Sequence, residues 1–344
     1  MPQITRREAL ALIGAGSIAA RDLCGLAARQ ERSSGPIIRT LVEDMAPERL
    51  GGGPVLFHEH LSMRFPFGAT QHYTDDVDLM VEEVRAAARD GVRCIVDGGH
   101  DDMGRNLEAL KRIATDGGIP IVASGGYYMQ RWYPPELAAK SVDEITDDLV
   151  RDARTKRFGA LGEIGQSAEM TDGERKVFQA VGKAHVRTGL PIFTHNAYTG
   201  VRASSVPRDS ALRQLDLLEG AGVKPQSVAI GHVCCLDEPT AEIAKAVAKR
   251  GAFVGFDRVT IEAIIPDARR AAMLLALLDA GYADQVLLSS DFSSARSLKK
   301  NGGAGLAQTA TVFAPMLVKA GASQAAVSRI LDDNPRRFLA FRPV

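Results

Sequence analysis

The feature of this sequence that most limits its fold is an eightfold alternation between short apolar runs and longer amphipathic stretches. The short runs are rich in β-branched residues, which is typical of strands buried on both faces. They lie at Pro54–Phe57, Arg93–Asp97, Pro120–Ser124, Phe158–Gly162, Pro191–Thr194, Ser227–Gly231, Ala252–Phe256 and Gln285–Ser289. The stretches between them repeat apolar residues with the period of an α-helix. They lie at Asp76–Arg89, Asn106–Thr115, Val142–Arg154, Glu174–Thr188, Ala211–Ala221, Thr240–Arg250 and Ala263–Ala280.

Strands that alternate with helices pair in parallel, because each helix carries the chain back to the same end of the sheet. Eight such units in roughly 280 residues fit a closed (β/α)8 barrel, the α/β architecture called a TIM barrel. A doubly wound open sheet is the alternative, but it needs a glycine-rich phosphate loop after an early strand. Gly51-Gly52-Gly53 precedes the first strand instead. We therefore predict a barrel.

Local signals support the predicted helix ends. Ser141 and Glu144 have the spacing of a capping box. Gly189 and Gly251 follow two of the helical stretches, where glycine commonly ends a helix. Two further helices, Leu306–Ala320 and Ser323–Asp332, are predicted to close the chain.

Residues 38–344 are predicted to form a single catalytic domain, since no linker or shift in composition divides them. Charge is balanced, with 42 basic and 42 acidic residues in the chain. A balanced chain offers no basic field for nucleic acid, so we expect a small-molecule substrate and no nucleic-acid partner.

The N-terminus resembles an export signal. Arg6 and Arg7 precede a mostly apolar stretch, Ala9 to Ala20, which is too short to span a bilayer. Paired arginines before such a stretch are typical of a twin-arginine signal, so residues 1–30 predict a periplasmic or otherwise exported protein. The alternative is a short amphipathic helix of a cytoplasmic protein. No later segment predicts stable membrane insertion.

Four of the seven histidines and two acidic residues lie where predicted strands should end. Each of them alone is more often a structural residue than a metal ligand. In a barrel, however, the carboxyl ends of all strands meet at one rim, so the six are expected to lie together. They are His58, His60, Glu163, His195, His232 and Asp291. This set has the ligand count of a two-metal hydrolase.

The first strand carries two of these residues on one face. A strand alternates its faces with period two, so His58 and His60 are expected to point the same way and Glu59 to point away. The remaining histidines are His72, His100 and His185. Of these, His100 follows the second strand on the same rim and is a candidate for the pocket wall.

The ordered motifs of the chain resemble the phosphotriesterase family of the amidohydrolase superfamily from about Ile38 to the C-terminus. The motifs are His58-Glu59-His60, Val96-Asp97-Gly98, Gly104-Arg105-Asn106, Gly162-Glu163-Ile164-Gly165, Thr188-Gly189-Leu190-Pro191-Ile192, Thr194-His195, Gly231-His232, Gly255-Phe256-Asp257-Arg258, Ser289-Ser290-Asp291, Gly302-Gly303 and Asn334-Pro335-Arg336-Arg337. The resemblance implies a binuclear hydrolase, and the family often forms homodimers.

By the same resemblance, His58, His60 and Asp291 would hold the more buried ion, and His195 and His232 the more exposed one. Glu163 would bridge the two ions. Many members of the family have a carboxylated lysine at this position, whereas this chain is similar to a branch that has glutamate. The nearest lysine, Lys156, precedes the fourth strand and is expected at the wrong end. A glutamate bridges with two oxygens, as a carbamate does. Its presence weakens any inference from the substrates of the family to the substrate class of this chain.

The ligand set predicts the chemistry. Imidazole and carboxylate ligands favour Zn²⁺, with Mn²⁺, Co²⁺ or Fe²⁺ as alternatives. Two such ions activate a bridging hydroxide that attacks a carbonyl or phosphoryl centre. Asp291 is the predicted proton acceptor, and its alternative role is that of a ligand only.

The loops after the strands are expected to form the substrate pocket. The loop after the third strand holds Tyr127, Tyr128 and Trp132, which predict either an apolar wall or ordinary loop packing. Asp257 and Arg258, after the seventh strand, resemble a pair that lies near the leaving group in the family. Arg258 could bind a carboxylate or phosphate, or could pair with another loop. Cys234 and Cys235, shortly after His232, either line the pocket or pack.

We expect a hydrolase of ester-like bonds. A lactone or carboxyl ester is the first choice, a phosphotriester the second and an amide the third. A non-catalytic protein that keeps its metal for structure is the alternative, although structural sites tend to close their coordination.

Overall fold

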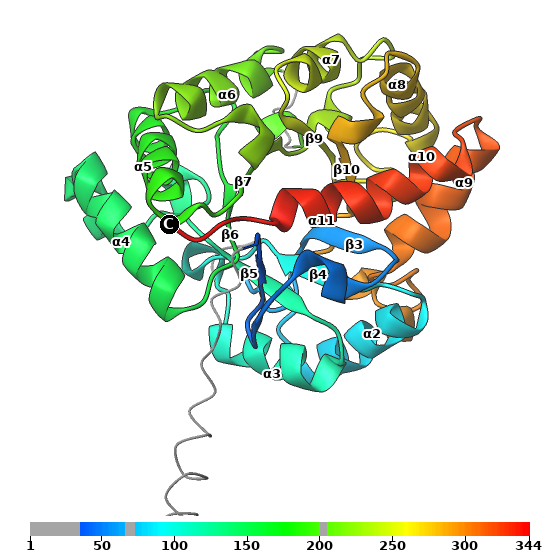
Figure 1. Ribbon diagram of the computed structural model, residues 1–344, viewed down its shortest axis with the longest axis horizontal. Helices are drawn as coiled ribbons and strands as arrows, with labels where there is room; N and C mark the ends of the chain where they lie inside the picture. Colours follow the sequence, from blue (N-terminus) through cyan, green and yellow to red (C-terminus); the bar gives the residue numbers. More distant parts are fainter. Residues whose placement is uncertain (1–34, 66–72, 200–204) are drawn as a thin grey trace, which may run out of the picture. The chain divides into compact units, whose positions relative to one another are not determined.

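Eight parallel strands form the centre of the protein in a computed structural model that describes residues 35–65, 73–199 and 205–344. Each strand is hydrogen-bonded to the next one in the chain, as a (β/α)8 barrel requires (Figure 1). They are β3 (Val55–Glu59), β4 (Cys94–Asp97), β5 (Ile121–Gly125), β6 (Ala160–Ile164), β7 (Ile192–Thr194), β8 (Val228–Ile230), β9 (Phe253–Phe256) and β10 (Val286–Leu288). The predicted strands and the predicted barrel are confirmed.

Helices surround these strands and follow them in alternation (Figure 1). They are α2 (Val77–Arg89), α3 (Leu107–Gly117), α4 (Val142–Thr155), α5 (Asp172–Thr188), α6 (Ser210–Gly220), α7 (Glu242–Lys249) and α8 (Asp267–Asp279). Ser141 and Glu144 form the predicted capping box of α4. Gly189 ends α5 in the left-handed conformation. These boundaries follow from side-chain chemistry, because caps satisfy backbone groups that have no partner inside the helix.

The C-terminal helices depart from the prediction in one respect. A π turn (Thr309–Phe313) precedes α9 (Ala314–Lys319), and a second π turn (Arg329–Asp333) joins α10 (Gln324–Ser328) to α11 (Asn334–Leu339). The second helix therefore continues past Asp332, its predicted end. Each π turn comes directly before an X-Pro pair, at Pro315 and Pro335. A proline has no N–H for the helical ladder, and a wider turn accommodates the missing bond.

Smaller elements complete the structure. An antiparallel pair, β1 (Ile38–Arg39) and β2 (Asp44–Met45), precedes the barrel and was not predicted. Short 3₁₀ turns lie at Pro47–Leu50, Asp101–Met103, Gln130–Trp132, Pro135–Ala139, Ala197–Thr199, Pro225–Ser227, Val233–Cys235, Ala283–Gln285, Ala295–Ser297 and Lys299–Asn301. Several of these turns follow strands, where they shape the loops of the rim.

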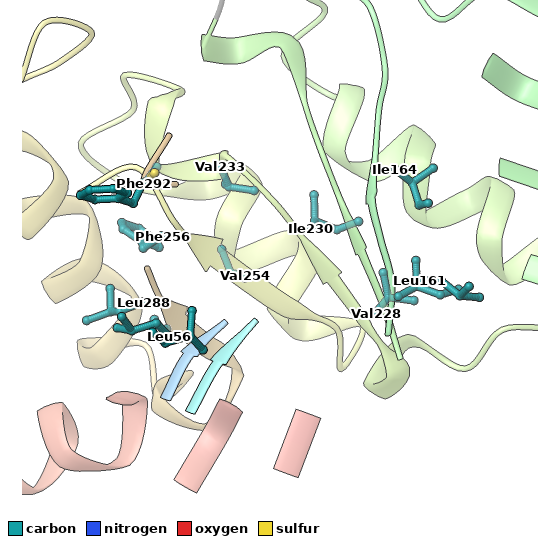
Figure 2. Close-up of a cluster of buried hydrophobic side chains, with 14 of the residues drawn as sticks. Leu56, Leu161, Ile164, Val228, Ile230, Val233, Val254, Phe256, Leu288 and Phe292 are labelled. Carbon is teal, nitrogen blue, oxygen red and sulfur yellow. The ribbon is translucent and has the colours of Figure 1, made fainter. Parts of the chain in front are cut away.

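Alternate residues of the strands pack on opposite faces of the barrel wall. Val55 and Phe57 belong to the interior cluster, whereas Leu56 packs against the surrounding helices. Figure 2 shows the outer layer, to which β6, β8, β9 and β10 contribute branched and aromatic side chains. Cys94 is buried in the interior. The barrel is therefore a filled core with its chemistry confined to one end.

The opposite end of the barrel is closed by α11. The ring of Phe338 lies 6.5 Å from that of Phe57 and 5.4 Å from that of Phe253, both edge-on. Figure 1 shows α11, in red, lying across the strands. This aromatic contact leaves the carboxyl ends of the strands as the open end of the barrel.

Strands β3 and β10 meet at that open end. Asp291 N donates to His58 O (3.1 Å), and His60 N donates to Phe292 O (2.8 Å). The buried carboxylate of Glu59 accepts from Ser289 Oγ (2.8 Å) and from the backbone N–H groups of Ser290 and Phe292. Glu59 thus points away from the site, as predicted, and fixes the chain segment that carries Asp291.

The predicted signal at residues 1–30 lies outside the described residues, and so does His72. Within residues 35–65, 73–199 and 205–344, no helix combines the length and apolar character needed to cross a membrane.

Candidate metal centre

The six predicted ligands come together at the carboxyl end of the barrel, and all six are buried. They form two groups that share Glu163. The first group contains His58, His60, Glu163 and Asp291, and the second contains Glu163, His195 and His232. The strand ends bring together residues that lie up to 233 positions apart in the chain, from 58 to 291.

In the first group, four potential donor atoms face one another. His60 Nε2 lies 2.9 Å from Asp291 Oδ1 and 3.6 Å from Glu163 Oε2. His58 Nε2 lies 3.4 Å from Glu163 Oε2 and 3.9 Å from Asp291 Oδ1. Ligands about 2.1 Å from a tetrahedral ion are separated by about 3.4 Å, so these spacings bracket what a metal requires.

The second group is tighter and uses the other oxygen of Glu163. His195 Nδ1 lies 2.7 Å, and His232 Nε2 2.8 Å, from Glu163 Oε1. The two imidazole nitrogens are 2.9 Å apart. Each carboxylate oxygen of Glu163 therefore faces a different group, as a bridging ligand does. Lys156 instead pairs with Asp101 and Asp152, so it does not supply the bridge.

Asp257 fixes the orientation of one histidine from each group. Its Oδ2 accepts from His58 Nδ1 (2.9 Å), and its Oδ1 accepts from His232 Nδ1 (3.0 Å) and His232 N (2.8 Å). Donation from Nδ1 leaves the Nε2 lone pair of each ring for a metal. His58 Nε2 is buried and has no hydrogen-bond partner among the described residues. An unpartnered buried nitrogen among carboxylates fits a cation site.

Sequence reasoning placed Asp257 near a leaving group, but the structure places it behind the histidines, fully buried. Its supporting role was missed. The signal that could have found it is the position of an acid at the end of β9, next to two strands whose ends carry histidines, since a ligating histidine usually donates its other N–H to a carboxylate.

Irregular backbone turns the predicted ligands inward. The β3–β4 register shifts between Leu56 and Glu59, and the β6–β7 register shifts between Leu161 and Ile164. Consequently both Phe57 and His58 pack their rings against Phe193 inside the barrel, at 6.4 and 5.2 Å. Bulges commonly re-aim side chains next to active sites.

Two of the predicted ligands also have left-handed backbone conformations. His232 has φ 59° and Asp291 has φ 49°. Such conformations cost roughly 1–2 kcal/mol for non-glycine residues and cluster at functional sites. The surrounding contacts, including those of Asp257 and Glu59, hold these residues in place.

The buried charges polarise one another strongly. Burial alone lowers the pKa of an imidazole, but Glu163 and Asp257 raise the pKa of His58 well above its usual value. Asp257 and Glu163 likewise outweigh burial and raise the pKa of His232 to about 10. Burial dominates at His195, whose pKa is lowered. Against burial, His58 and His195 hold the pKa of Glu163 well below its usual range. The carboxylates are therefore charged at neutral pH, as metal ligands must be.

A cavity of about 200 Å³ lies over the ligands. Of the predicted substrate residues, Tyr128, Trp132 and Arg258 line it. The Tyr128 hydroxyl is 3.2 Å from His195 Nδ1, and Arg258 pairs with Asp291 Oδ2. Sequence reasoning missed Arg131 and an apolar wall of Met63, Phe65 and Met103.

Tyr127 lines a different cavity, of about 380 Å³, together with Asp101 and Arg105. Trp132 lines both cavities and so lies between them. The two adjacent tyrosines of this loop therefore face different cavities.

Three other candidates lie outside the cavity wall. His100 is buried, and its Nε2 donates to Gly162 O (2.6 Å). Cys234 and Cys235 are buried in the outer hydrophobic cluster, with their sulfurs 4.0 Å apart. Cys234 Sγ also lies 4.0 Å from Asp257 Oδ1. Both cysteines therefore pack behind the ligands.

Over residues 39–339, the sequence matches the Phosphotriesterase family. The chain belongs to this family. Phosphotriesterase-family proteins are hydrolases that depend on two metal ions, and the ligand groups above are consistent with that dependence.

Individual relatives differ in what they hydrolyse. The chain is 33% identical to the phosphotriesterase homology protein of Escherichia coli (strain K12), over 83% of this chain and 97% of that protein. It is 25% identical to N-acetyltaurine hydrolase of Danio rerio, over 89% of this chain and 98% of that enzyme. A lactonase structure from Listeria monocytogenes is similar with a TM-score of 0.79 and 26% identity, over 89% of this chain and 99% of that one.

The first testable consequence concerns Asp257. We expect Asp257→Asn to lower metal affinity by about 10- to 100-fold, because an amide no longer orients His58 and His232 equally well. Titration of metal-free protein with Zn²⁺ measures this. Asp237→Asn is the matched control, since Asp237 pairs with Arg269 at the surface. Equal affinities of the two variants would contradict the supporting role.

The second consequence concerns protons. Because nearby carboxylates raise the pKa of His58 and of His232, we expect both rings to hold a proton in the metal-free protein at neutral pH. A metal must displace those protons from Nε2, so we expect uptake to release about two protons and apparent affinity to fall as pH falls. Calorimetry in buffers of different ionisation enthalpy counts them. Binding heats that do not depend on the buffer would refute this expectation.

Proposed function

We propose that the protein is a binuclear metal-dependent hydrolase of ester-like bonds, with a lactone or carboxyl ester as first choice and a phosphotriester as second. The observation that carries this proposal is the position of Glu163. Its Oε1 lies within 2.8 Å of His195 and His232, and its Oε2 lies 3.4 Å from His58 and 3.6 Å from His60. A carboxylate shared in this way suits two cations side by side.

Zn²⁺ is the proposed metal, since histidine and carboxylate ligands suit it, with Mn²⁺, Co²⁺ or Fe²⁺ as alternatives. His58, His60 and Asp291 would hold one ion, His195 and His232 the other, and Glu163 both. When bound, the two ions would lower the pKa of a water molecule towards neutrality and polarise the bond under attack.

Asp291 is the proposed proton acceptor. Its Oδ1 faces His60, and its Oδ2 accepts from Arg258, which outweighs burial and holds the pKa of Asp291 below its usual range. The carboxylate is therefore free of protons at neutral pH, and a proton taken from the nucleophile would be held only briefly before it is passed on.

Tyr128 is the proposed donor to the substrate. Its buried hydroxyl lines the cavity beside His195. Burial, followed by the charge of Glu163, raises the pKa of Tyr128 well above its usual value. The phenol therefore stays neutral and can donate a hydrogen bond to a carbonyl or phosphoryl oxygen.

An amide hydrolase on the same site is the second candidate. The similarity to N-acetyltaurine hydrolase over nearly the full length of both chains favours it. The same residues can serve, because attack on an amide carbonyl also develops negative charge on oxygen. The additional requirement is a proton for the departing nitrogen, which protonated Asp291 can return.

Metal analysis and a substrate panel test this proposal. We expect purified protein to hold about two ions per chain, and we expect Glu163→Ala to lose most of the metal and the activity. Glu169→Ala, an exposed change in the loop that also follows β6, is the control. The panel contains lactones, aryl esters, phosphotriesters and N-acyl compounds. Full activity in protein stripped of metal would refute the mechanism, and bound metal without turnover would favour a non-catalytic binding protein.

We also propose that residues 1–30 direct export to the periplasm. The support is the Arg6-Arg7 pair followed by an apolar stretch of 12 residues, Ala9 to Ala20. When residues 1–30 are fused to a folded reporter, we expect the reporter to be carried out of the cytoplasm. When both arginines are replaced by lysine, we expect the reporter to remain in the cytoplasm. A reporter that stays in the cytoplasm with the natural residues as well as with the lysine variant would exclude export by this route.

A further inference from the structure

The cavity over the ligand groups contains two arginines from separate loops. Arg131 lies in the loop after β5, and Arg258 lies directly after β9. Within the described part of the chain, the only acids that line this cavity are Glu163 and Asp291, and both belong to the ligand groups. Once metal is bound, the positive charge in the cavity therefore exceeds the negative charge of these two acids.

Arg258 has hydrogen-bonding capacity that the described residues do not use. One of its amino groups, Nη1, donates to Asp291 Oδ2. Its Nε is buried without a hydrogen-bond partner in the described part of the chain. A buried guanidinium N–H without a partner is costly, and an oxyanion would satisfy it.

Arg131 carries a charge that no described carboxylate neutralises. Its guanidinium lies 5.1 Å from the centre of the Trp132 ring, and no ion pair of this exposed side chain is found among the described residues. A cation–π contact orients an arginine without cancelling its charge. Arg131 is therefore available to an anion that enters the cavity.

Charge arithmetic supports the same conclusion. Two divalent ions and two arginines contribute about six positive charges, whereas Glu163, Asp291, Asp257 and a hydroxide contribute about four negative ones. The loaded site would thus carry about two positive charges in a partly enclosed space. Such a site attracts anions and raises their local concentration.

The apolar part of the cavity wall limits the size and polarity of the rest of the substrate. Met63 and Met103 form a small apolar cluster with Tyr128, and Phe65 and Trp132 pack against it. The cavity of about 200 Å³ has room for roughly seven water-sized groups. A small molecule with a short hydrocarbon part fits this wall.

We infer that this site acts on small acyl compounds that carry an oxyanion, a carboxylate or sulfonate, which Arg131 and Arg258 bind while the scissile carbonyl faces the ligand groups. This inference rests on the proposed function for the reaction and adds the substrate class. Arg131 is a specificity residue in this scheme, because it contacts the anion and no metal ligand.

Matched substrates that differ only in charge test the inference. Each pair compares a carboxylate with its carboxamide: monomethyl succinate with methyl succinamate, 5-oxotetrahydrofuran-2-carboxylate with its amide, and N-acetyl-β-alanine with its amide. N-acetyltaurine replaces the carboxylate by a sulfonate and so separates the two oxyanions. We expect metal-loaded enzyme to favour the charged member of the cleaved pair by about 10- to 100-fold in kcat/KM, the range of a charged hydrogen bond.

Variants assign that preference to the arginines. Arg131→Gln should lower kcat/KM for the anion by about tenfold or more, mainly through KM, and should lower it far less for the neutral member. Arg131→Lys should recover part of the loss, and higher ionic strength should reduce the preference. Arg258→Gln is compared at equal metal content, since Arg258 touches Asp291. Arg296→Gln is the control, because Arg296 is exposed and does not line the cavity.

The outcomes separate this inference from the proposed function. Equal rates for both members of a cleaved pair, or an Arg131→Gln variant that slows both equally, would overturn the inference and leave the hydrolase intact. If metal-loaded protein cleaves no pair, the substrate panel above still decides the proposed function, and calorimetry with the same compounds decides the inference. Binding of the carboxylate but not the carboxamide supports it, and equal binding or none overturns it.

Discussion

The organisation of the site depends on one buried carboxylate, that of Asp257. It accepts N–H groups from His58 and from His232, residues that belong to different ligand groups and different strands. A charge in this position is stable only because several donors surround it, and the donors are oriented only because the charge is there. Neither ligand group can change its geometry without disturbing the other, so the two behave as one structural unit.

The rest of the barrel supports that unit from two sides. Glu59 binds the segment after β10 and thereby sets the place of Asp291, while Phe193 packs beneath the ring of His58. Phe338 closes the far end and fills the interior. Positive φ angles at His232 and Asp291 indicate that these contacts impose a conformation that the isolated backbone would avoid. The packing of the core thus stabilises the arrangement of the predicted ligands.

Much of this arrangement could be predicted from the sequence. Period and β-branching located all eight strands, and a barrel brings every strand end to one rim, so the proximity of His58, Glu163 and Asp291 follows from topology. Side chains in loops obey no such period. The sequence therefore could not show that Tyr127 and Tyr128 line different cavities, and Arg131 was missed although it lies beside Trp132. Asp257 was misplaced because a resemblance indicates which residues belong to a site but not which lie behind it.

The contact between the first and last strands of the barrel, β3 and β10, has a consequence for how the protein is made. His58 and His60 lie in the first strand of the barrel, and Asp291 follows the last one. During synthesis, the nascent chain displays two imidazoles long before Asp291, the last carboxylate of their group, exists. The first ligand group is completed only when β10 docks beside β3, which requires nearly the whole chain. A metal ion that needs this whole group would therefore be bound only after β10 has been made, and shorter chains lack a finished centre.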